Sequence, residues 1–182
     1  NFEYGIEHIS SEDDDGIYHA MNRGKEIAKG DYLIYMNAGD IFANSNVLAS
    51  VKLDLMKHVN APDVIYGDVI LKSGKNREIQ KAIDLKYLYK GMCFCHQSVF
   101  VKNDLTWFDT EYKLAADYKL FLNLYKNKNS FHYLPIPISI YDTSGLSNSL
   151  PALVEQFQAA LFSMRSMFHY LPRIIYNYLK NV

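Results

Sequence analysis

Apolar residues near the start of the chain recur at helical spacing and then give way to a continuous apolar run. The pattern predicts a helix that Asp14 or Asp15 can cap and that stops at Gly30. Its apolar positions are Ile17, Ala20, Met21, Gly24, Ile27 and Ala28. The next segment, DYLIYM at 31–36, does not alternate with polar residues, which is typical of a strand in a parallel sheet covered by helices on both faces.

The same reasoning predicts the elements in the middle of the chain. Residues 46–58 have the spacing of an amphipathic helix, and DVIYGDVIL at 63–71 with the turn KSGK is typical of a strand and hairpin. A helical stretch is expected at 84–90, followed by a strand within CHQSVFV at 95–101. Helices and strands therefore alternate, as they do in α/β proteins.

Three further elements are expected in the last part of the chain. A helix over 116–128 should be buried through Leu120, Phe121, Leu124 and Tyr125. PIPISIYDTSGLSN at 135–148 has the pattern of a strand followed by a loop, and the tail from 151 is expected to be helical with an interruption at Pro172. The chain is thus divided into a main unit, 1–150, and a helical tail, 151–182.

Composition and charge narrow the class of protein. The 182 residues are 49% hydrophobic and 21% charged, as in an ordinary globular protein, and the net charge of −1 argues against a nucleic-acid partner. Cys93 and Cys95 are spaced for neither a disulfide framework nor a zinc site without further ligands, so a reducing cytoplasm is expected. No apolar run approaches the ~20 residues of a membrane span, and no signal peptide is evident.

Five segments carry a resemblance to a known family. They are SEDDDGIYHAMNRGKEIAKGDYLIYMNAGD, YGD at 66–68, HQSVF at 96–100, FDTEYKLAADYKLFL at 108–122 and IYDTSGLS at 140–147. Together they resemble family 2 glycosyltransferases of bacterial capsule, exopolysaccharide or O-antigen synthesis. The resemblance implies a GT-A-like, Rossmann-related α/β fold with a mixed sheet flanked by helices. It also implies inverting transfer from a nucleotide sugar to a saccharide or lipid-linked acceptor.

The resemblance implies a metal site at NAGD, residues 37–40. Glycosyl transfer places negative charge on a diphosphate leaving group, which requires a divalent cation or fixed cations. In the family an acidic motif at the end of a strand holds the cation, and Asp40 is the one carboxylate of the matching segment here. Mg²⁺ or Mn²⁺, which prefer oxygen ligands and retain waters, are the expected cofactors. The alternative is a simple turn whose aspartate caps the next helix.

The family's catalytic base matches Asp117 in AADYKLFL. Inverting transfer requires a carboxylate that accepts the proton of the acceptor hydroxyl as its oxygen attacks the anomeric carbon. A helix N-terminus would keep that carboxylate ionised. Taken alone, an aspartate before an apolar helical stripe is an N-cap, which is the alternative interpretation.

Nucleotide contacts are implied for the loop at Asp15 and Gly16 and for Asn22 and Arg23 on the helix that follows. Arg23 would offset diphosphate charge, and the aspartate would contact a ribose hydroxyl or the water shell of the metal. The alternative is a solvated acidic cap followed by a surface arginine.

The acceptor side is expected to comprise Asp68, His96, Gln97, Gly145 and Ser147. Hydrogen-bonding side chains there would orient sugar hydroxyls, and the loop around Gly145 would close over the donor or acceptor to exclude water. Asp68 could instead be a solvated acid at the end of a hairpin. A zinc site at His96 with the nearby cysteines lacks a fourth ligand.

One departure from the family is the lack of its first strand–helix–strand unit. Such a unit would take at least about 30 residues for a single βαβ. The fold is therefore expected to be N-terminally incomplete, with an exposed sheet edge that a homodimer would cover. An inactive scaffold or binding protein of the same fold is one alternative function, and a nucleotidyltransferase is another.

The tail combines basic and aromatic residues, and no acidic residue follows Glu155. Such a helix could lie on an anionic membrane at the inner face of the cell membrane, near lipid-linked acceptors. The alternative is an amphipathic helix that packs on its own domain or on a partner subunit.

Overall fold

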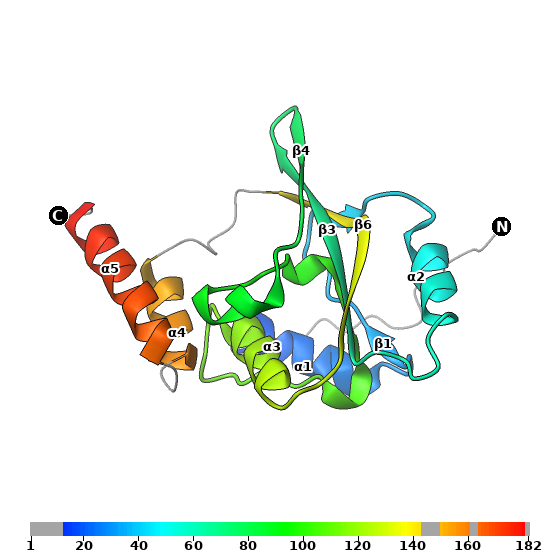
Figure 1. Ribbon diagram of the computed structural model, residues 1–182, viewed down its shortest axis with the longest axis horizontal. Helices are drawn as coiled ribbons and strands as arrows, with labels where there is room; N and C mark the ends of the chain where they lie inside the picture. The colour runs from blue at the N-terminus through cyan, green and yellow to red at the C-terminus, as the bar shows by residue number, and fades with distance from the viewer. Residues whose placement is uncertain (1–12, 143–149, 161–163, 181–182) are drawn as a thin grey trace.

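The computed structural model describes residues 13–142, 150–160 and 164–180, which form a mixed sheet with helices against it (Figure 1). The strands are β1 (Tyr32–Leu33), β2 (Ile41–Phe42), β3 (Val64–Ser73), β4 (Asn76–Gln80), β5 (Val99–Lys102) and β6 (Phe131–Asp142). The helices are α1 (Ile17–Ile27), α2 (Val47–Leu55), α3 (Ala116–Lys126), α4 (Leu150–Ala160) and α5 (Met164–Lys180). Short 3₁₀ helices lie at η1 (Leu85–Lys90), η2 (His96–Ser98) and η3 (Asn103–Leu105).

The six strands are ordered β1-β5-β3-β6-β2, with β4 paired to β3 as a hairpin. β3 is parallel to β6 and antiparallel to β4 and β5, which confirms the predicted mixed α/β sheet. β1 differs from the sequence expectation, because only Tyr32 and Leu33 form a ladder and their partner β5 runs antiparallel. The remaining residues of 31–36 find no strand partner in the described chain. β1 ends the sheet there, and a homodimer through this edge stays a prediction.

Atoms of β6 come very close to Gly67 in β3, which explains the glycine of the YGD motif. Its register against β6 shifts around Asp68. A Cβ on Gly67 would lie 2.6 Å from the carbonyl oxygen of Ile136, so a glycine is needed here. Asp68 is consequently held inside the sheet, 4% exposed, where its carboxylate accepts hydrogen bonds from Tyr133 Oη (2.7 Å) and the Ala82 N–H (3.0 Å). The interpretation of Asp68 as a solvated hairpin-end acid is therefore wrong.

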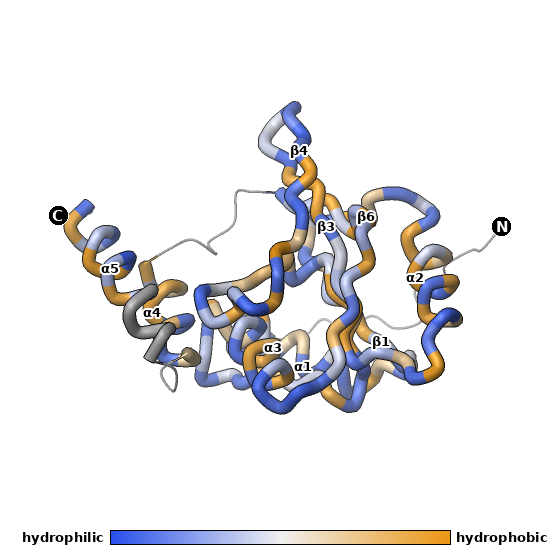
Figure 2. The backbone as a smooth tube through the Cα atoms, viewed as in Figure 1, coloured by the Kyte–Doolittle hydropathy of each residue, from blue (hydrophilic) through white to orange (hydrophobic). Residues whose placement is uncertain are grey.

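The two faces of the sheet bury different helices. Val64 and Tyr66 of β3 belong to the larger core with α1, α3 and the tail, whereas Ile65 points into a smaller core with α2. This alternation follows from the two-residue period of a strand. Helix α2 accordingly lies on one side of β3 and β6, and α3 lies on the other (Figure 1). Figure 2 shows the tip of the β3–β4 hairpin as hydrophilic, away from both cores.

Helices α1 and α3 form as predicted, with two corrections. The expected carboxylate cap of α1 is absent, because Asp14 accepts a hydrogen bond from the Gly16 N–H (2.9 Å) and no side chain caps the helix itself. Gly16 has φ 123°, a conformation that favours glycine. In α3 the buried residues include Tyr118 and Leu122 beyond the expected stripe, whereas Tyr125 is 40% exposed.

The tail forms two helices that pack on the rest of the protein. Ala159, Ala160 and Tyr170 belong to the larger core. The expected interruption at Pro172 is wrong, since α5 continues through the proline, which costs the helix the one hydrogen bond that proline cannot donate. Among the described helices, none is both long and apolar enough to cross a bilayer.

Candidate functional site

Asp117 is the centre of a hydrogen-bond cluster that joins three elements. It is the second residue of α3, and its Oδ2 lies 3.1 Å from His96 Nδ1 of η2. Its Oδ1 accepts hydrogen bonds from Tyr18 Oη of α1 (3.0 Å) and from the backbone N–H of Tyr118 (2.8 Å). Residues distant in sequence thus converge on one carboxylate, whose side chain is 20% exposed.

These contacts decide the charge of Asp117. Burial opposes ionisation, but the hydrogen bond and charge of His96, with the Tyr118 and Tyr18 donors, outweigh it and lower the pKa of Asp117. Burial and the charge of Asp117 raise the pKa of Tyr18, which keeps the phenol protonated as a donor. At neutral pH Asp117 is therefore a carboxylate able to accept a proton.

His96 is fixed by aromatic rings as well as by Asp117. Its ring stacks on Phe108 at 5.8 Å between centroids, and the rings of Tyr35 (6.0 Å) and Phe121 (6.4 Å) meet it edge-on. Its Nε2 is buried and has no hydrogen-bond partner in the described part of the chain. The rings and the carboxylate thus fix the orientation of the imidazole.

The N-terminus of α3 is held by a residue that sequence reasoning did not place in the site. Glu155 of α4 accepts hydrogen bonds from the backbone N–H groups of Lys113 (3.0 Å), Leu114 (2.7 Å) and Ala115 (2.9 Å). These groups precede the helix and would otherwise lack partners. The tail therefore supports the turn that presents Asp117. The only sequence signal was that Glu155 is the last acidic residue of the chain.

Asp40 closes a tight turn between β1 and β2. The Asp40 N–H donates to the Asn37 carbonyl (3.0 Å), and Asp40 Oδ2 accepts from the Asn37 N–H (3.3 Å). β2 follows directly, so Asp40 caps no helix. Burial, with the charges of Asp40 and Asp117, raises the pKa of the Cys95 thiol to about 12. The charges of both carboxylates therefore act on this one thiol.

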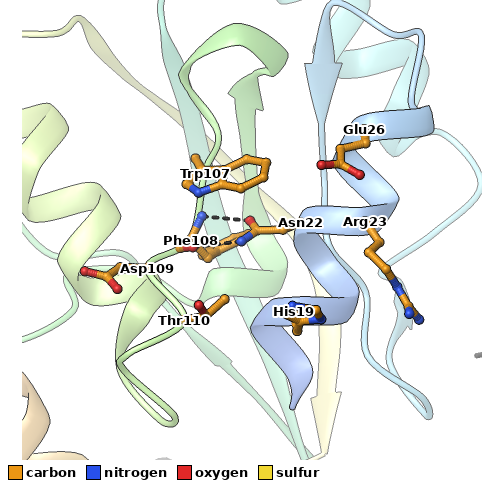
Figure 3. A pocket seen from close by; sticks show the side chains of 8 residues that line it. All are labelled: His19, Asn22, Arg23, Glu26, Trp107, Phe108, Asp109 and Thr110. Carbon is orange, nitrogen blue, oxygen red and sulfur yellow. Dashed lines mark hydrogen bonds between the residues drawn. The ribbon is translucent and has the colours of Figure 1, made fainter. Parts of the chain in front are cut away.

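Two of the four predicted nucleotide residues, Asn22 and Arg23, border a cavity beside α1. The cavity has a volume of about 560 Å³ and is lined by Asn22, Arg23 and residues 107–110 among others (Figure 3). The Asn22 amide is engaged, since Nδ2 donates to the Phe108 carbonyl (2.8 Å) and Oδ1 accepts from the Phe108 N–H (2.9 Å). Arg23 Nη1 donates to the Asp13 carbonyl (3.1 Å). Asn22 therefore has a structural role, and its contact with a nucleotide stays a prediction.

The remaining predicted residues have mixed placements. Asp15 and Gly16 are exposed at the entry to α1. Gln97 is buried beside His96, and its Oε1 accepts a hydrogen bond from the Cys95 thiol at 3.0 Å. Gly145 and Ser147 lie outside the described residues. Roles for these residues and for Asp68 toward substrates stay predictions.

The mixed sheet with helices on both faces is a glycosyltransferase fold. TarS of S. aureus, residues 1–349, superimposes with a TM-score of 0.58 at 14% identity, over 82% of this chain and 46% of TarS. The complex of the same protein with UDP gives a TM-score of 0.57 at 16% identity, over 78% of this chain and 43% of TarS.

Sequence similarity also links the chain to proteins named glycosyltransferases. The chain is 30% identical over 148 residues to PGL/p-HBAD biosynthesis glycosyltransferases of Mycobacterium bovis and Mycobacterium tuberculosis. The match covers 78% of this chain and 57% of each relative, so the chain spans a little over half the length of these homologues. No family model matches the chain.

Proposed function

We propose that the protein transfers a sugar from a nucleotide sugar to a saccharide or lipid-linked acceptor, with inversion, in bacterial surface polysaccharide or glycolipid synthesis. Its homologues are named glycosyltransferases of PGL/p-HBAD biosynthesis, and TarS, which shares the fold, has been solved with UDP. The observation that carries the proposal is the Asp117 carboxylate, ionised and held by His96 and Tyr18 at the start of α3.

In this proposal Asp117 is the general base. As the acceptor oxygen attacks the anomeric carbon, its proton passes to the carboxylate and the bond to the nucleoside diphosphate breaks. Oδ1 already accepts two hydrogen bonds, whereas Oδ2 contacts His96, so Oδ2 is the oxygen with room for a further donor. His96 and Tyr18 orient the carboxylate and stabilise its charge.

Asp40 is proposed to bind Mg²⁺ or Mn²⁺. A single carboxylate is a hard oxygen donor of the kind these cations take, and diphosphate oxygens and water would complete the coordination. The cation would neutralise charge on the departing diphosphate. The turn itself fixes the carboxylate, because the Asn37 N–H donates a hydrogen bond to Asp40 Oδ2.

The test is a titration of Mn²⁺ or Mg²⁺ into metal-free full-length protein, with nucleotide-sugar turnover as the readout. We expect turnover to require metal. In Asp40→Ala the metal concentration for half-maximal turnover should rise by more than the roughly 10- to 100-fold that removal of an outer-shell partner costs. Asp31→Ala, which removes an exposed carboxylate before β1, is the matched control. Full turnover without metal, or in Asp40→Ala, would reject the role; binding without turnover would favour the inactive scaffold.

A specific observation also favours peripheral membrane contact. Apolar side chains of α5 remain exposed, namely Leu171, Ile175, Tyr176, Tyr178 and Leu179. Arg173 and Lys180 lie on the same helix, and each basic residue near an anionic surface contributes about 1 kcal/mol. We expect co-sedimentation with anionic vesicles, no co-sedimentation with neutral ones, and loss of binding on exchange of Ile175 and Tyr176 for serine. Equal binding to both vesicle types, or to neither, would reject this contact.

A further inference from the structure

A second cluster of ionisable side chains lies on the α2 side of the sheet, with no role in the proposed transfer reaction. Asp54 Oδ2 is 2.7 Å from His132 Nε2 and 3.6 Å from His58 Nε2. The three ligand atoms all lie within 4.8 Å of one another. In the described part of the chain this is the one place where three such side chains converge.

The fold brings these residues together from two elements. Asp54 is in the last turn of α2 and His58 lies four residues later, so both face the same side of the helix end. His132 is the second residue of β6 and is aligned with Ile65 of β3. Packing of α2 on the sheet, through Val51 and its neighbours in the smaller core, fixes the helix end beside the strand.

The Asp54 carboxylate is approached by two imidazole nitrogens and by a lysine. Its side chain is 10% exposed, and Lys57 Nζ lies 3.3 Å from Oδ1. Oδ2 is buried, and His132 Nε2 approaches it at the distance of an ion pair, 2.7 Å. The rings of His58 and His132 are 4.4 Å apart and nearly perpendicular. Two imidazole nitrogens and one carboxylate oxygen therefore converge on a common point.

We propose that Asp54, His58 and His132 bind Zn²⁺, or a transition-metal ion of similar preference, with water in the fourth position. Tetrahedral zinc with bonds of about 2.0–2.1 Å holds its ligand atoms roughly 3.3 Å apart. The observed separations of 2.7 and 3.6 Å from Asp54 Oδ2 bracket that value, and all three ligand atoms lie within 4.8 Å of one another, so side-chain rotations would bring them to a common ion. Nitrogen ligands set this site apart from the oxygen chemistry proposed for Asp40. The ion would fasten the end of α2 to β6.

The experiment is a calorimetric titration of Zn²⁺ into chelator-treated full-length protein, repeated on His58→Gln and His132→Gln. We expect one saturable ion at the cluster, and a loss of affinity in each variant greater than the roughly 10- to 100-fold cost of losing an outer-shell partner. His19→Gln, which changes an exposed histidine of α1 outside the cluster, is the matched control and should bind as the unaltered protein does.

A cobalt titration distinguishes this cluster from a site at the cysteines, and circular dichroism checks folding. Co²⁺ at the cluster should give the visible bands of tetrahedral nitrogen and oxygen coordination without the near-ultraviolet band of a cobalt–thiolate bond, which Cys93 or Cys95 would produce. Circular dichroism of each metal-free variant tests whether it folds. The side chain of His58 is 28% exposed, so we expect the protein to tolerate its replacement. Absence of saturable binding, a thiolate band, or affinity unchanged in both His58→Gln and His132→Gln would overturn the proposal.

Discussion

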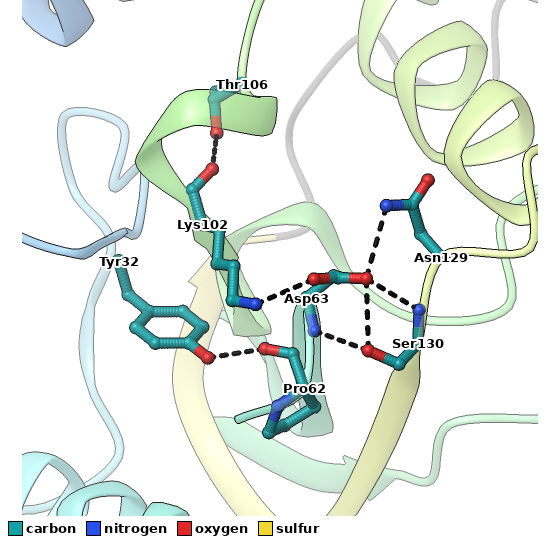
Figure 4. Close-up of polar contacts among 7 residues, drawn as sticks. All are labelled: Tyr32, Pro62, Asp63, Lys102, Thr106, Asn129 and Ser130. Carbon is teal, nitrogen blue, oxygen red and sulfur yellow. Dashed lines mark hydrogen bonds and ion pairs between the residues drawn. The ribbon is translucent and has the colours of Figure 1, made fainter. Parts of the chain in front are cut away.

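Asp63 and Asp117 both gather several hydrogen-bond donors, but the donors differ in kind. Asp63 Oδ1 pairs with Lys102 Nζ at 2.8 Å, and Oδ2 accepts from Asn129 Nδ2 (3.2 Å), the Ser130 N–H (2.9 Å) and Ser130 Oγ (3.1 Å) (Figure 4). Lys102 ends β5, Asp63 precedes β3 and Ser130 precedes β6, so this carboxylate ties three strands together.

At Asp117 the partner is a histidine instead of a lysine. Lysine stays charged through the physiological range, whereas histidine changes protonation within it. Asp63 is therefore locked in a permanent ion pair, and the hydrogen bond of Lys102 lowers its pKa most. At the Asp117–His96 pair, Nε2 has no hydrogen-bond partner among the described residues. Asp63 thus ties strands together, whereas Asp117 is the carboxylate that we propose as the general base.

The largest expected effect is on transfer activity in Asp117→Asn. Asparagine keeps the size and still accepts the Tyr18 and Tyr118 hydrogen bonds, but it cannot take a proton. Turnover should fall by roughly 10²- to 10⁴-fold with nucleotide binding retained, measured by steady-state assay and calorimetry. Asp63→Asn is the matched control, and it should keep its turnover at temperatures where the protein stays folded. Near-normal turnover in Asp117→Asn would remove the contrast between the two carboxylates.

The next effect is on stability, and here Asp63 is expected to matter more than Asp117. Asp63→Asn loses the charge-assisted bond to Lys102, a class worth about 1.5–3 kcal/mol, so the free energy of unfolding in urea should drop by about that amount. Asp104→Asn, an exposed aspartate of η3, controls for loss of negative charge. An unfolding midpoint equal to that of the unaltered protein would show that Asp63 contributes nothing to the strand junction.

Removal of the Glu155 carboxylate, which accepts the backbone N–H groups before α3, should have a smaller effect on both stability and turnover. Glu155→Gln keeps an acceptor oxygen but loses the charge that three backbone N–H groups contact, so we expect about 1 kcal/mol of destabilisation and a modest fall in turnover. Urea unfolding and turnover are measured on the same preparation, with Glu111→Gln, an exposed glutamate, as control. A change in stability alone would mean that Asp117 is held in place without the tail.

The smallest effect is the pH dependence of stability. Asp63 has a lowered pKa in the folded protein, so its stabilisation is complete above the unfolded value of about 3.9 and is lost as pH falls through the folded pKa. The difference in unfolding free energy between the unaltered protein and Asp63→Asn should therefore shrink below about pH 4. Urea titrations between about pH 6 and about pH 2 measure it. A difference that grows on acidification would give the opposite sign and contradict the pKa direction.

Local sequence patterns were enough to predict the elements whose signals lie within a few residues. The β3–β4 hairpin formed around the predicted turn because its pairing needs only adjacent residues, with Lys72 aligned with Arg77. Helix α3 began at the expected place, and this put Asp117 in its first turn. The length and direction of β1 were wrong because they depend on β5, a partner distant in the chain.

The sequence by itself determined the α/β class, the position of Asp117 on its helix and the turn that carries Asp40, since each follows from local spacing and backbone preference. Only the tertiary structure decided which side chains act together. Tyr18 reaches Asp117 across 99 residues of sequence, and Glu155 reaches Leu114 across 41. His132 likewise meets Asp54 only because β6 lies against α2. Contacts of this kind depend on how the sheet orders its strands, and no periodicity along the chain records that order.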